Sequence, residues 1–394
     1  MKPLRFLLTA ALAVLCSSVC LAGKYDRQGM VEGDAMEFAV PVATLPAGSY
    51  IQFGVTMENI GLKAPLHYMV EFYDGGGWVT DPAYVYEDGL SKYSFRTVSS
   101  AEKHPTTFLV AYKLEHMVSD SLRVRCRVCS PFAADGSLLD AKEPENKVGL
   151  KNKHYVAWKL QPLGNGDGFP ENRILLIGNS FTYFFGVPFM LQEIAFSQGT
   201  VLQVNASLKG GQTFRQHCGL DMTQSQIMLP RNYDIAILQG QSQEPAKYAA
   251  APDSLKDVRK AFCTLCGMIR ADHPECRIYA ERTWAYPALD NGGFASIEEF
   301  DVLLARGAAM LAEAAGAEIS PVGAAFAKAA EETPDILVLD HDYKHQSRYG
   351  AYLKACSTWL TISGKTRFEG PVPSCGLPAD VAAALRKVAE NAAL

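Results

Sequence analysis

The sequence predicts an α/β fold with a parallel sheet, preceded by an all-β sandwich. In residues 24–160, short segments alternate apolar and polar side chains, which is typical of half-buried strands. From residue 173 onward, short apolar runs alternate with segments of helical period, which indicates a parallel sheet covered by helices on both faces. Residues 161–172, between the two patterns, are rich in Gly, Pro and Asn and predict a linker.

Length and composition are those of an ordinary globular protein. The 394 residues are enough for two domains with proper cores, and 48% of them are hydrophobic and 20% charged. The formal net charge of -5 leaves no basic surface of the size that nucleic-acid binding requires. We therefore expect no nucleic-acid partner.

Residues 1–22 have the pattern of a secretory signal peptide. Lys2 and Arg5 give a positive start, residues 6–15 are apolar, and residues 20–22 are small enough for a cleavage site. The apolar run is too short to span a bilayer, and no later run is long enough. The sequence thus predicts an exported protein, periplasmic or secreted, without an integral membrane span. Lipid attachment at Cys20 is the less favoured alternative, because Val19 is larger than such sites prefer at that position.

Two cysteine pairs have the CxxC spacing of zinc and redox sites, namely Cys126 with Cys129 and Cys263 with Cys266. The first pair lies on a segment with strand alternation, so its two side chains point to opposite faces. The second pair falls within a predicted helix, whereas a redox CxxC belongs at a helix N-terminus. We therefore interpret most of these cysteines as core residues, and we expect no metal and no cofactor.

The β pattern of the first region, residues 24–160, recurs along several segments. These are 51–57, 68–72, 108–114, 122–129 and 155–160. Short strands without convincing helices favour a β-sandwich, which we interpret as an accessory domain. Its aromatic residues allow two interpretations, a face that stacks on sugar rings or ordinary core packing. They include Tyr73, Trp78, Tyr84, Tyr86 and Tyr93.

The second region, residues 173–394, has the pattern of a doubly wound sheet. Buried-strand patterns fall at 174–177, 201–204, 235–238, 277–280 and 318–322. Helical periodicity marks 187–195, 255–271, 297–315, 349–360 and 381–392. Ser296 and Glu299 can form a capping box at the start of the helix 297–315, and Gly316 can end it.

One stretch of this region combines a strand, a sharp turn and a helix. The apolar run 174–177 ends at Gly178 and Asn179, and Ser180 lies at the break before the helix. In an open α/β sheet such a turn lies at the carboxyl end of a strand, where ligands bind. The Ser180 hydroxyl would be exposed there, beside the free N–H groups of a helix start, which can stabilise an oxyanion. The alternative is that Ser180 only caps the helix.

A serine nucleophile needs a base and a group that orients the base. His345 follows Asp342 by three residues in one predicted loop, so the carboxylate can fix the tautomer of the imidazole. The alternatives are a polar loop that caps the next helix, or a pairing of His341 with Asp340. His217 is expected on a helix surface, although it can also reach the pocket.

Four separated segments together resemble the SGNH (GDSL-like) hydrolase superfamily over residues 173–394. They are 178–180 (Gly-Asn-Ser), 205–211 (Asn-Ala-Ser-Leu-Lys-Gly-Gly), 238–242 (Leu-Gln-Gly-Gln-Ser) and 342–345 (Asp-Tyr-Lys-His). The resemblance implies a three-layer, flavodoxin-like fold and serine esterase activity. The chain departs from the superfamily pattern at Asn179, where Asp is commoner, and at Gln241, where Asn is expected.

The resemblance also implies a role for each matched residue. Ser180 would be the nucleophile, His345 the base and Asp342 the residue that orients the base. The N–H groups of Ser180 and Gly210, with the side-chain amide of Gln241, would stabilise the tetrahedral oxyanion.

Export and a β-sandwich neighbour favour the deacetylation of carbohydrate, with a small-molecule or glycan ester as substrate. The rivals are a lipase or thioesterase of the same fold, for which no apolar lid segment is evident, and a non-catalytic glycan-binding protein. The residues considered for substrate contact are Asn179, Trp284, Tyr286 and His217, with Arg282 and Thr283 next to Trp284. Burial in the core is the alternative for residues 282–286.

Overall fold

The computed structural model describes residues 27–32, 35–60, 66–80, 97–99, 106–129, 153–228 and 232–393. The predicted signal peptide with Cys20, and the aromatic residues Tyr84, Tyr86 and Tyr93, lie outside the described residues. No helix within the described ranges is long and apolar enough to cross a membrane.

A parallel sheet forms the centre of the second region. Its strands are β10 (Glu171–Gly178), β11 (Val201–Leu208), β12 (Ile235–Leu238), β13 (Arg277–Glu281) and β14 (Glu318–Ser320). They lie side by side in the order β11-β10-β12-β13-β14. β10 pairs in parallel with both β11 and β12, so the winding of the chain reverses beside β10. This is the flavodoxin-like order, in which ligands bind at the carboxyl ends of the strands next to the reversal.

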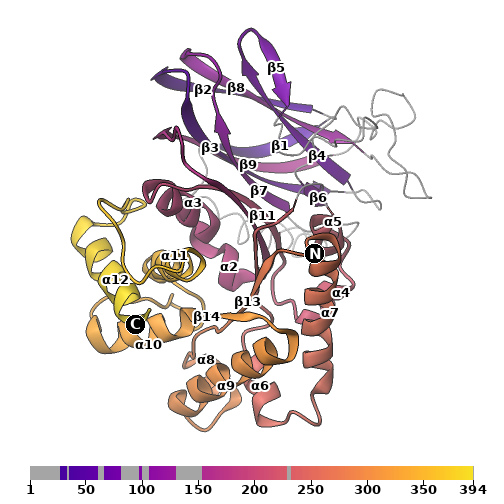
Figure 1. Cartoon of the computed structure of the whole chain (residues 1–394), viewed down its shortest axis with the longest axis vertical. Helices are drawn as coiled ribbons and strands as arrows, with labels where there is room; N and C mark the ends of the chain where they lie inside the picture. The colour runs from indigo at the N-terminus through magenta and orange to yellow at the C-terminus, as the bar shows by residue number, and fades with distance from the viewer. Residues whose placement is uncertain are drawn as a thin grey trace, which may run out of the picture.

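Helices cover both faces of the parallel sheet, as Figure 1 shows. The first face packs against α3 (Val187–Ser197), α10 (Val322–Glu332), α11 (Arg348–Ser363) and α12 (Ala379–Ala392). The second face packs against α4 (Phe214–Cys218), α5 (Asp221–Ile227), α7 (Lys256–Asp272) and the end of α9 (Ile297–Ala315). Along β10, Ile174 and Leu176 point to the first face and Leu175 and Ile177 to the second, as the alternation of a strand requires. The predicted α/β fold class is confirmed.

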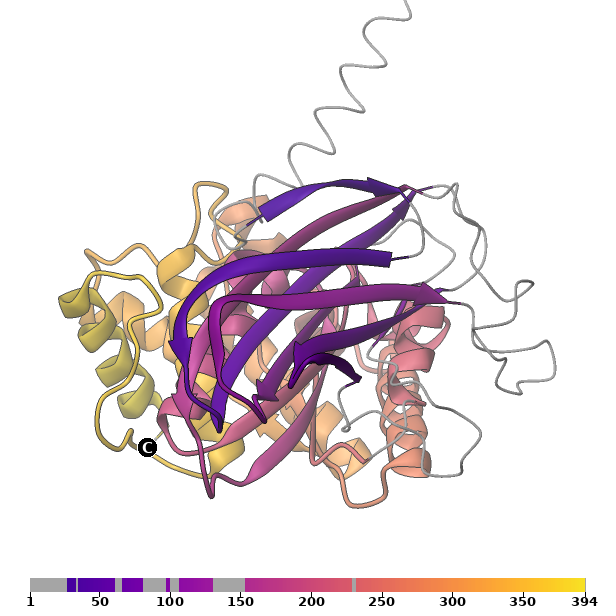
Figure 2. The same ribbon diagram turned by 90° about the horizontal axis from the view of Figure 1, so that it is seen from above.

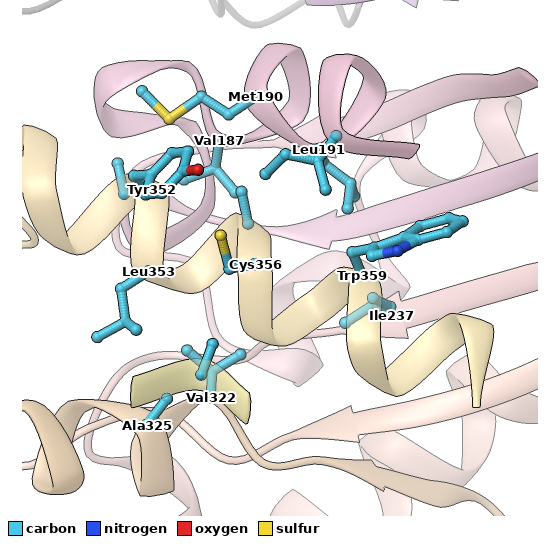
Figure 3. Close-up of a cluster of buried hydrophobic side chains, with 14 of the residues drawn as sticks. Val187, Met190, Leu191, Ile237, Val322, Ala325, Tyr352, Leu353, Cys356 and Trp359 are labelled. Carbon is cyan, nitrogen blue, oxygen red and sulfur yellow. The ribbon is translucent and has the colours of Figure 1, made fainter. Parts of the chain in front are cut away.

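Helix α11 is the central helix of the first face. Figure 3 shows it between α3 and α10, with Tyr352 and Cys356 towards α3 and Leu353 towards α10. It is buried along most of its length, which is the pattern of an interior helix rather than of a surface one.

Two antiparallel sheets make up the first region. The strands of one sheet are, in spatial order, β1 (Arg27–Glu32), β9 (Lys153–Asn165), β3 (Ser49–Ile60) and β7 (Thr106–Lys113). Those of the other sheet are β2 (Ala35–Leu45), β8 (Val118–Cys129), β4 (Leu66–Asp74) and β5 (Gly77–Thr80). The short strand β6 (Thr97–Ser99) also pairs with β4. The two sheets face each other, because Phe72 of β4 stacks on Tyr112 of β7 with ring centroids 4.1 Å apart and meets Phe53 of β3 edge-on at 6.2 Å. In Figure 1 β2, β5 and β8 lie above β3, β7 and β9, and Figure 2 looks down onto these strands.

Tyr73 and Trp78, two of the aromatic residues considered for sugar stacking, alternate with core positions on β4 and β5 and are half-buried. Arg123 lies over both rings, with its guanidinium carbon 4.7 Å from the Tyr73 centroid and 5.0 Å from that of Trp78. Arg125 lies over Trp78 at 4.3 Å. These rings are therefore already engaged with arginine side chains, and sugar stacking on this face stays a prediction.

Strand pairing and side-chain contacts join the first region to the second, and its interpretation as an accessory domain stays a prediction. β7 pairs antiparallel with β11, so one antiparallel sheet continues into the parallel sheet. The Gln203 side chain extends this pairing, donating to the carbonyl of Ala111 at 2.7 Å and accepting from its N–H at 3.1 Å. Gln52 donates to the carbonyl of Phe189 at 3.1 Å. The Phe189 ring also fills the space beside Gly54, where a Cβ would come within 2.2 Å of it.

The stretch predicted to be a linker is mostly strand. Residues 161–165 end β9 and residues 171–172 begin β10, so only residues 166–170 connect the two strands. A register shift in the β9–β3 pairing between Pro162 and Gly164 accommodates the residues that break a regular strand. Gly and Pro here mark a bulge and a short turn rather than a boundary between domains.

The helix predicted from its caps has the predicted bounds. α9 spans Ile297–Ala315, with Ser296 Oγ accepting from the Glu299 N–H at 3.1 Å and Gly316 ending the helix at a φ of 58°. α10 has no counterpart among the predicted helices, because its Ala-rich sequence offers few large apolar residues to set a period. The short elements are α2 (Ser180–Tyr183), η3 (Phe184–Gly186), α6 (Glu244–Ala250) and α8 (Ala288–Gly293).

Candidate active site

The nucleophile turn, residues 178–182, joins β10 to α2. Ser180 is the first residue of α2, and the Asn179 side chain caps this helix by accepting from the Phe181 N–H at 3.1 Å. Glycine at position 178 lets Gln239 approach the turn closely, because a Cβ there would lie 2.9 Å from Gln239 Oε1 and force it to shift. Ser180 therefore lies where the flavodoxin-like order places ligands, at the carboxyl end of β10.

The acid–base loop, residues 339–346, is held by its own hydrogen bonds. Its ends pair through a bridge between Leu339 and Gln346. Asp342 Oδ1 accepts from the N–H groups of Lys344 at 3.0 Å and His345 at 2.9 Å. Asp342 Oδ2 lies 2.5 Å from His345 Nδ1. The loop thus presents the carboxylate and the imidazole to each other.

The Asp342 carboxyl is held in its ionised form. Burial, the largest single influence, raises its pKa, but hydrogen bonds from the His345 ring and from the N–H groups of His345 and Lys344 outweigh burial and lower the pKa below its usual value. An ionised Asp342 fixes the proton of His345 on Nδ1 and leaves Nε2 as a proton acceptor.

The nucleophile turn and the acid–base loop meet although 165 residues separate Ser180 from His345. Ser180 Oγ lies 2.8 Å from His345 Nε2. The structure therefore brings Ser180, His345 and Asp342 together in the order that general-base activation of a serine requires. His341, the alternative base, is exposed and pairs with Asp340 at 2.9 Å instead.

The candidate oxyanion donors come from the loops that follow β10, β11 and β12. In the part of the chain that the structure describes, the N–H groups of Ser180 and Gly210 donate to no protein acceptor, so both are available to a ligand. Gly210 is exposed. A Cβ on it would lie 3.1 Å from the hydroxyl oxygen of Tyr183, so a larger residue would crowd this side of the site.

Gln241 lies on the loop after β12, but its side chain turns back onto that loop. Its Oε1 accepts from the Gln243 N–H at 2.8 Å, and its Nε2 lies 3.3 Å from Ser242 Oγ. The second contact is long for a hydrogen bond, whereas the first would have to be given up if the amide turned towards a ligand. Oxyanion stabilisation by Gln241 stays a prediction.

The four residues considered for substrate contact are buried, which for Trp284 and Tyr286 favours the alternative of core packing. Their exposed fractions are 2% for Asn179, 0% for His217, 1% for Trp284 and 0% for Tyr286. Trp284 follows β13 as predicted, but it stacks on Phe181 of the nucleophile turn with ring centroids 4.3 Å apart. These side chains support the site from beneath rather than touch a substrate.

His217 supports the nucleophile turn from α4 and does not lie on the surface. Its Nε2 lies 3.1 Å from the carbonyl oxygen of Gly178, and its Nδ1 lies 2.9 Å from Thr223 Oγ1. Burial lowers the pKa of His217 to about 4, although the bond to the Gly178 carbonyl opposes this. At neutral pH the ring is therefore uncharged, with Nε2–H donating to Gly178.

Asn179 ties the loops after β11 and β12 to the nucleophile turn. Its Nδ2 donates to the carbonyl of Gly240 at 2.9 Å and to that of Gln212 at 3.3 Å. An ionised aspartate is an acceptor only and could donate neither bond. Asn rather than Asp at position 179 thus has a physical reason, because the carbonyl oxygens of Gly240 and Gln212 both need a donor.

Sequence reasoning missed Gln346, a buried residue next to His345. Its Nε2 lies within hydrogen-bond distance of the carbonyl oxygens of Ser180 (3.2 Å), Phe181 (3.1 Å) and Phe184 (3.3 Å). This side chain fastens the acid–base loop to the helical turn that carries the nucleophile. Only its place directly after the Asp-x-x-His segment could have indicated it.

Glu244, at the start of α6, is a second missed residue. Its Oε2 accepts from the N–H groups of Gln241 and Phe214, each at 3.1 Å. Burial raises the pKa of Glu244 to about 7, although the two hydrogen bonds lower it. The carboxyl group holds the loop after β12 against α4.

The described residues contain no group of three or more His, Cys, Asp or Glu placed to hold a metal ion. Cys263 and Cys266 lie within α7 and are free thiols. Burial raises the pKa of Cys266 to about 12, as expected of a core thiol. The side chains of Cys126 and Cys129 lie outside the described part of the chain.

No family model and no curated protein matches this chain, but solved structures do. A DUF4886 family protein from Bacteroides uniformis ATCC 8492 is 20% identical over 56% of this chain and 94% of that chain, with a TM-score of 0.49. A family two carbohydrate esterase from Cellvibrio japonicus is 9% identical over 86% of this chain and 98% of that one, with a TM-score of 0.35. An acetyl xylan esterase, AlAXEase, is 14% identical over 48% and 99%, with a TM-score of 0.38. Each of these likenesses is partial and of low sequence identity.

Proposed function

We propose that this chain is an exported serine esterase that removes small O-acyl groups, chiefly O-acetyl, from carbohydrate. The observation that carries the proposal is the line of contacts from Ser180 Oγ to His345 Nε2 at 2.8 Å and from His345 Nδ1 to Asp342 Oδ2 at 2.5 Å. A protein that only bound glycans would not need this ordered path for a proton. The non-catalytic alternative is therefore disfavoured.

In the proposed mechanism, His345 takes the Ser180 proton as Oγ attacks the acyl carbonyl carbon, and Asp342 stabilises the imidazolium that forms. The N–H groups of Ser180 and Gly210 stabilise the negative charge on the carbonyl oxygen, with Gln241 as the candidate third donor. Collapse of the tetrahedral intermediate gives the acyl-serine, and His345 passes its proton to the leaving alcohol. His345 then activates a water that attacks the acyl-serine and releases the carboxylic acid.

The surroundings of the imidazole support a short acyl group. The rings of Phe184 and Phe181 lie beside the His345 ring, with centroids 4.6 Å and 5.3 Å from its own. They occupy space near the reacting atoms that a long chain would need. The predicted signal peptide adds the expectation that the enzyme meets extracellular or periplasmic polysaccharide.

Labelling of the full chain with a fluorophosphonate tests the proposal. The probe reacts with activated serines, so a single labelled peptide containing Ser180 is expected, together with turnover of an aryl acetate. Ser180→Ala should abolish labelling and lower turnover by several orders of magnitude without changing the thermal midpoint. Labelling at another serine, or normal turnover by Ser180→Ala, would overturn the assignment.

A series of aryl esters separates the acetylesterase from the lipase and thioesterase alternatives. We expect kcat/KM to be highest for acetate and to fall as the acyl chain grows to butyrate and octanoate. A maximum at octanoate would favour the lipase alternative. Release of acetate from an acetylated polysaccharide, compared with Ser180→Ala, then tests the carbohydrate part.

A further inference from the structure

A buried ion pair lies beneath the nucleophile turn and takes no part in the mechanism above. Lys354 of α11 and Glu281 at the end of β13 are 1% and 4% exposed, and Lys354 Nζ lies 2.6 Å from Glu281 Oε1. The adjoining void has a volume of about 10 Å³, room for at most one water molecule. The pair therefore has almost no contact with solvent, and it belongs to the layer in which α11 packs against the sheet (Figure 3).

Two charged side chains in an apolar interior cost free energy, because both lose their contact with water. Burial lowers the pKa of Lys354, while the charge of Glu281 and its hydrogen bond raise it. A buried ion pair often contributes no more to stability than apolar residues of the same size would. The hydrogen bonds that the pair makes with its neighbours therefore indicate a role other than stability.

Hydrogen bonds lead from this pair to the nucleophile turn. Lys354 Nζ donates to Thr182 Oγ1 at 3.1 Å. Thr182 Oγ1 donates to Gln239 Oε1 at 3.1 Å. The same Gln239 oxygen accepts from the backbone N–H of Asn179 at 3.1 Å. The line therefore ends one residue before the nucleophile.

These side chains are closely packed, and their donors and acceptors allow the Thr182 hydroxyl only one arrangement of hydrogen bonds. The Lys354 ammonium offers only protons, so the Thr182 hydroxyl must accept from it and can donate only to Gln239. A Cβ on Gly178 would lie 2.9 Å from the Gln239 oxygen and 3.0 Å from the Thr182 oxygen. The charge of Lys354 thus fixes the direction of each hydrogen bond up to the Asn179 N–H.

We propose that Lys354, Glu281, Thr182 and Gln239 form a positioning line that fixes the backbone at Asn179, and so holds the Ser180 hydroxyl and N–H in register with His345. The inference rests on the proposed function of Ser180 as a nucleophile. None of the four side chains would touch the substrate. Their effect is on geometry, and a displacement of about 1 Å in an active site can cost about 100-fold in rate.

The first test breaks the line at Thr182 without changing the ion pair. Thr182→Val keeps the shape of the side chain and removes the hydroxyl, so kcat for an aryl acetate should fall about 10- to 100-fold with KM little changed. The rate of fluorophosphonate labelling should fall in parallel. Thr182→Ser restores the hydroxyl and should recover most of the loss. A merely structural role would lower the thermal midpoint and leave kcat of the folded enzyme unchanged.

The second test removes the charges together, so that neither is left buried and unpaired. The double variant Lys354→Met with Glu281→Leu should fold, with a thermal midpoint equal to or above that of the parent. Its kcat should nevertheless fall by the same factor as that of Thr182→Val, and adding Thr182→Val to it should cost little more.

The outcomes separate this inference from the proposed function. A parent enzyme that neither labels at Ser180 nor hydrolyses esters would refute the proposed function itself. A parent that is active, with full kcat in both Thr182→Val and the double variant, would refute only the positioning line. If the double variant does not fold, the comparison of Thr182→Val with Thr182→Ser decides alone.

Discussion

The nucleophile turn and the acid–base loop contribute to one triad but are held in opposite ways. In the turn, Asn179 is 2% and Thr182 4% exposed, and their partners come from other elements of the fold. In the loop, the Asp342 side chain is 40% exposed and that of His341 91%. Hydrogen bonds within three residues along the chain align Asp342 with His345. One half of the site thus depends on the core, while in the other half local hydrogen bonds align the carboxylate with the imidazole and the buried Trp284 adds one bond, from Nε1 to the Lys344 carbonyl at 3.0 Å.

Gln346 is one of the residues that connect the two parts. It belongs to the acid–base loop by sequence, yet it is buried and contacts the carbonyl oxygens of the nucleophile turn. We therefore expect mutations in the buried turn to affect stability as well as rate. Mutations in the exposed loop should affect rate alone.

The largest expected effect is that of Asp342→Asn in the exposed loop. Asparagine can present an N–H to Nδ1 and so favours the wrong tautomer of His345, which should lower kcat by about 10⁴-fold. The thermal midpoint should stay within a degree or two, because the side chain is 40% exposed and its backbone partners are local. Esterase kinetics and a thermal melt measure both. Asp340→Asn, which alters the exposed pair with His341, is the matched control and should leave kcat unchanged.

A loss of less than tenfold in Asp342→Asn would contradict the role of Asp342. A large fall in the thermal midpoint would instead contradict the proposed independence of this loop from the core.

The sequence was sufficient for the parts of the site that are local. The Asp-x-x-His spacing places both groups in one loop, and the break from an apolar run to Gly178, Asn179 and Ser180 indicates a strand, a turn and a helix. Both patterns depend on residues a few positions apart. The structure brings these groups together at 2.8 Å and 2.5 Å.

The sequence was insufficient wherever distant elements decide burial. The sequence favours a helix surface for His217 and leaves Trp284 and Tyr286 open between pocket and core, and all three are buried because of how the helices pack. Lys354 follows Leu353 in a helix whose apolar residues gave no sign that its lysine also faces inward. The pairing of β7 with β11 likewise joins segments about a hundred residues apart, which no local pattern indicates.

The next largest effect is expected at Gln241, which tests whether the buried half of the site supplies a third oxyanion donor. If the amide contacts the developing oxyanion, Gln241→Ala should lower kcat by about 10²- to 10³-fold, or roughly 2.7–4 kcal/mol, with KM little changed. Gln241→Glu should be at least as harmful, because a carboxylate has no donor and repels the oxyanion. Full kcat in Gln241→Ala would mean that the N–H groups of Ser180 and Gly210 suffice.

A smaller effect, on stability first, is expected for Asn179→Asp, the reverse of the exchange at Asp342. The new carboxylate would face the carbonyl oxygens of Gly240 and Gln212 and lose both donated bonds. The Gly240 carbonyl keeps the Gln239 amide as a donor, but the loss of both bonds from Asn179 should still cost about 1–3 kcal/mol, measured by urea unfolding. An unchanged free energy of unfolding would show that the buried turn tolerates the superfamily's commoner residue and is less dependent on the core than we infer.

The smallest effect concerns Glu244, whose carboxyl group holds the loop that carries Gln241. Its pKa is raised from 4.5 to about 7 in the folded chain, so between these values the folded state keeps a proton that the unfolded state releases. The stability that this group contributes is therefore complete below pH 4.5 and is lost as the pH rises through about 7, at no more than about 1.4 kcal/mol per pH unit. Glu244→Gln stays neutral throughout. The thermal midpoint of the variant should consequently rise relative to that of the parent as the pH is raised from 5 to 8.

His217, with its pKa lowered to about 4, works in the opposite direction, since its contribution is complete above pH 6.5 and is lost as the pH falls. Because it is present in both proteins, it cancels from the difference. Parallel midpoint curves for the two proteins would show that Glu244 is ionised in the folded chain at all these pH values, and that burial does not outweigh its two backbone hydrogen bonds.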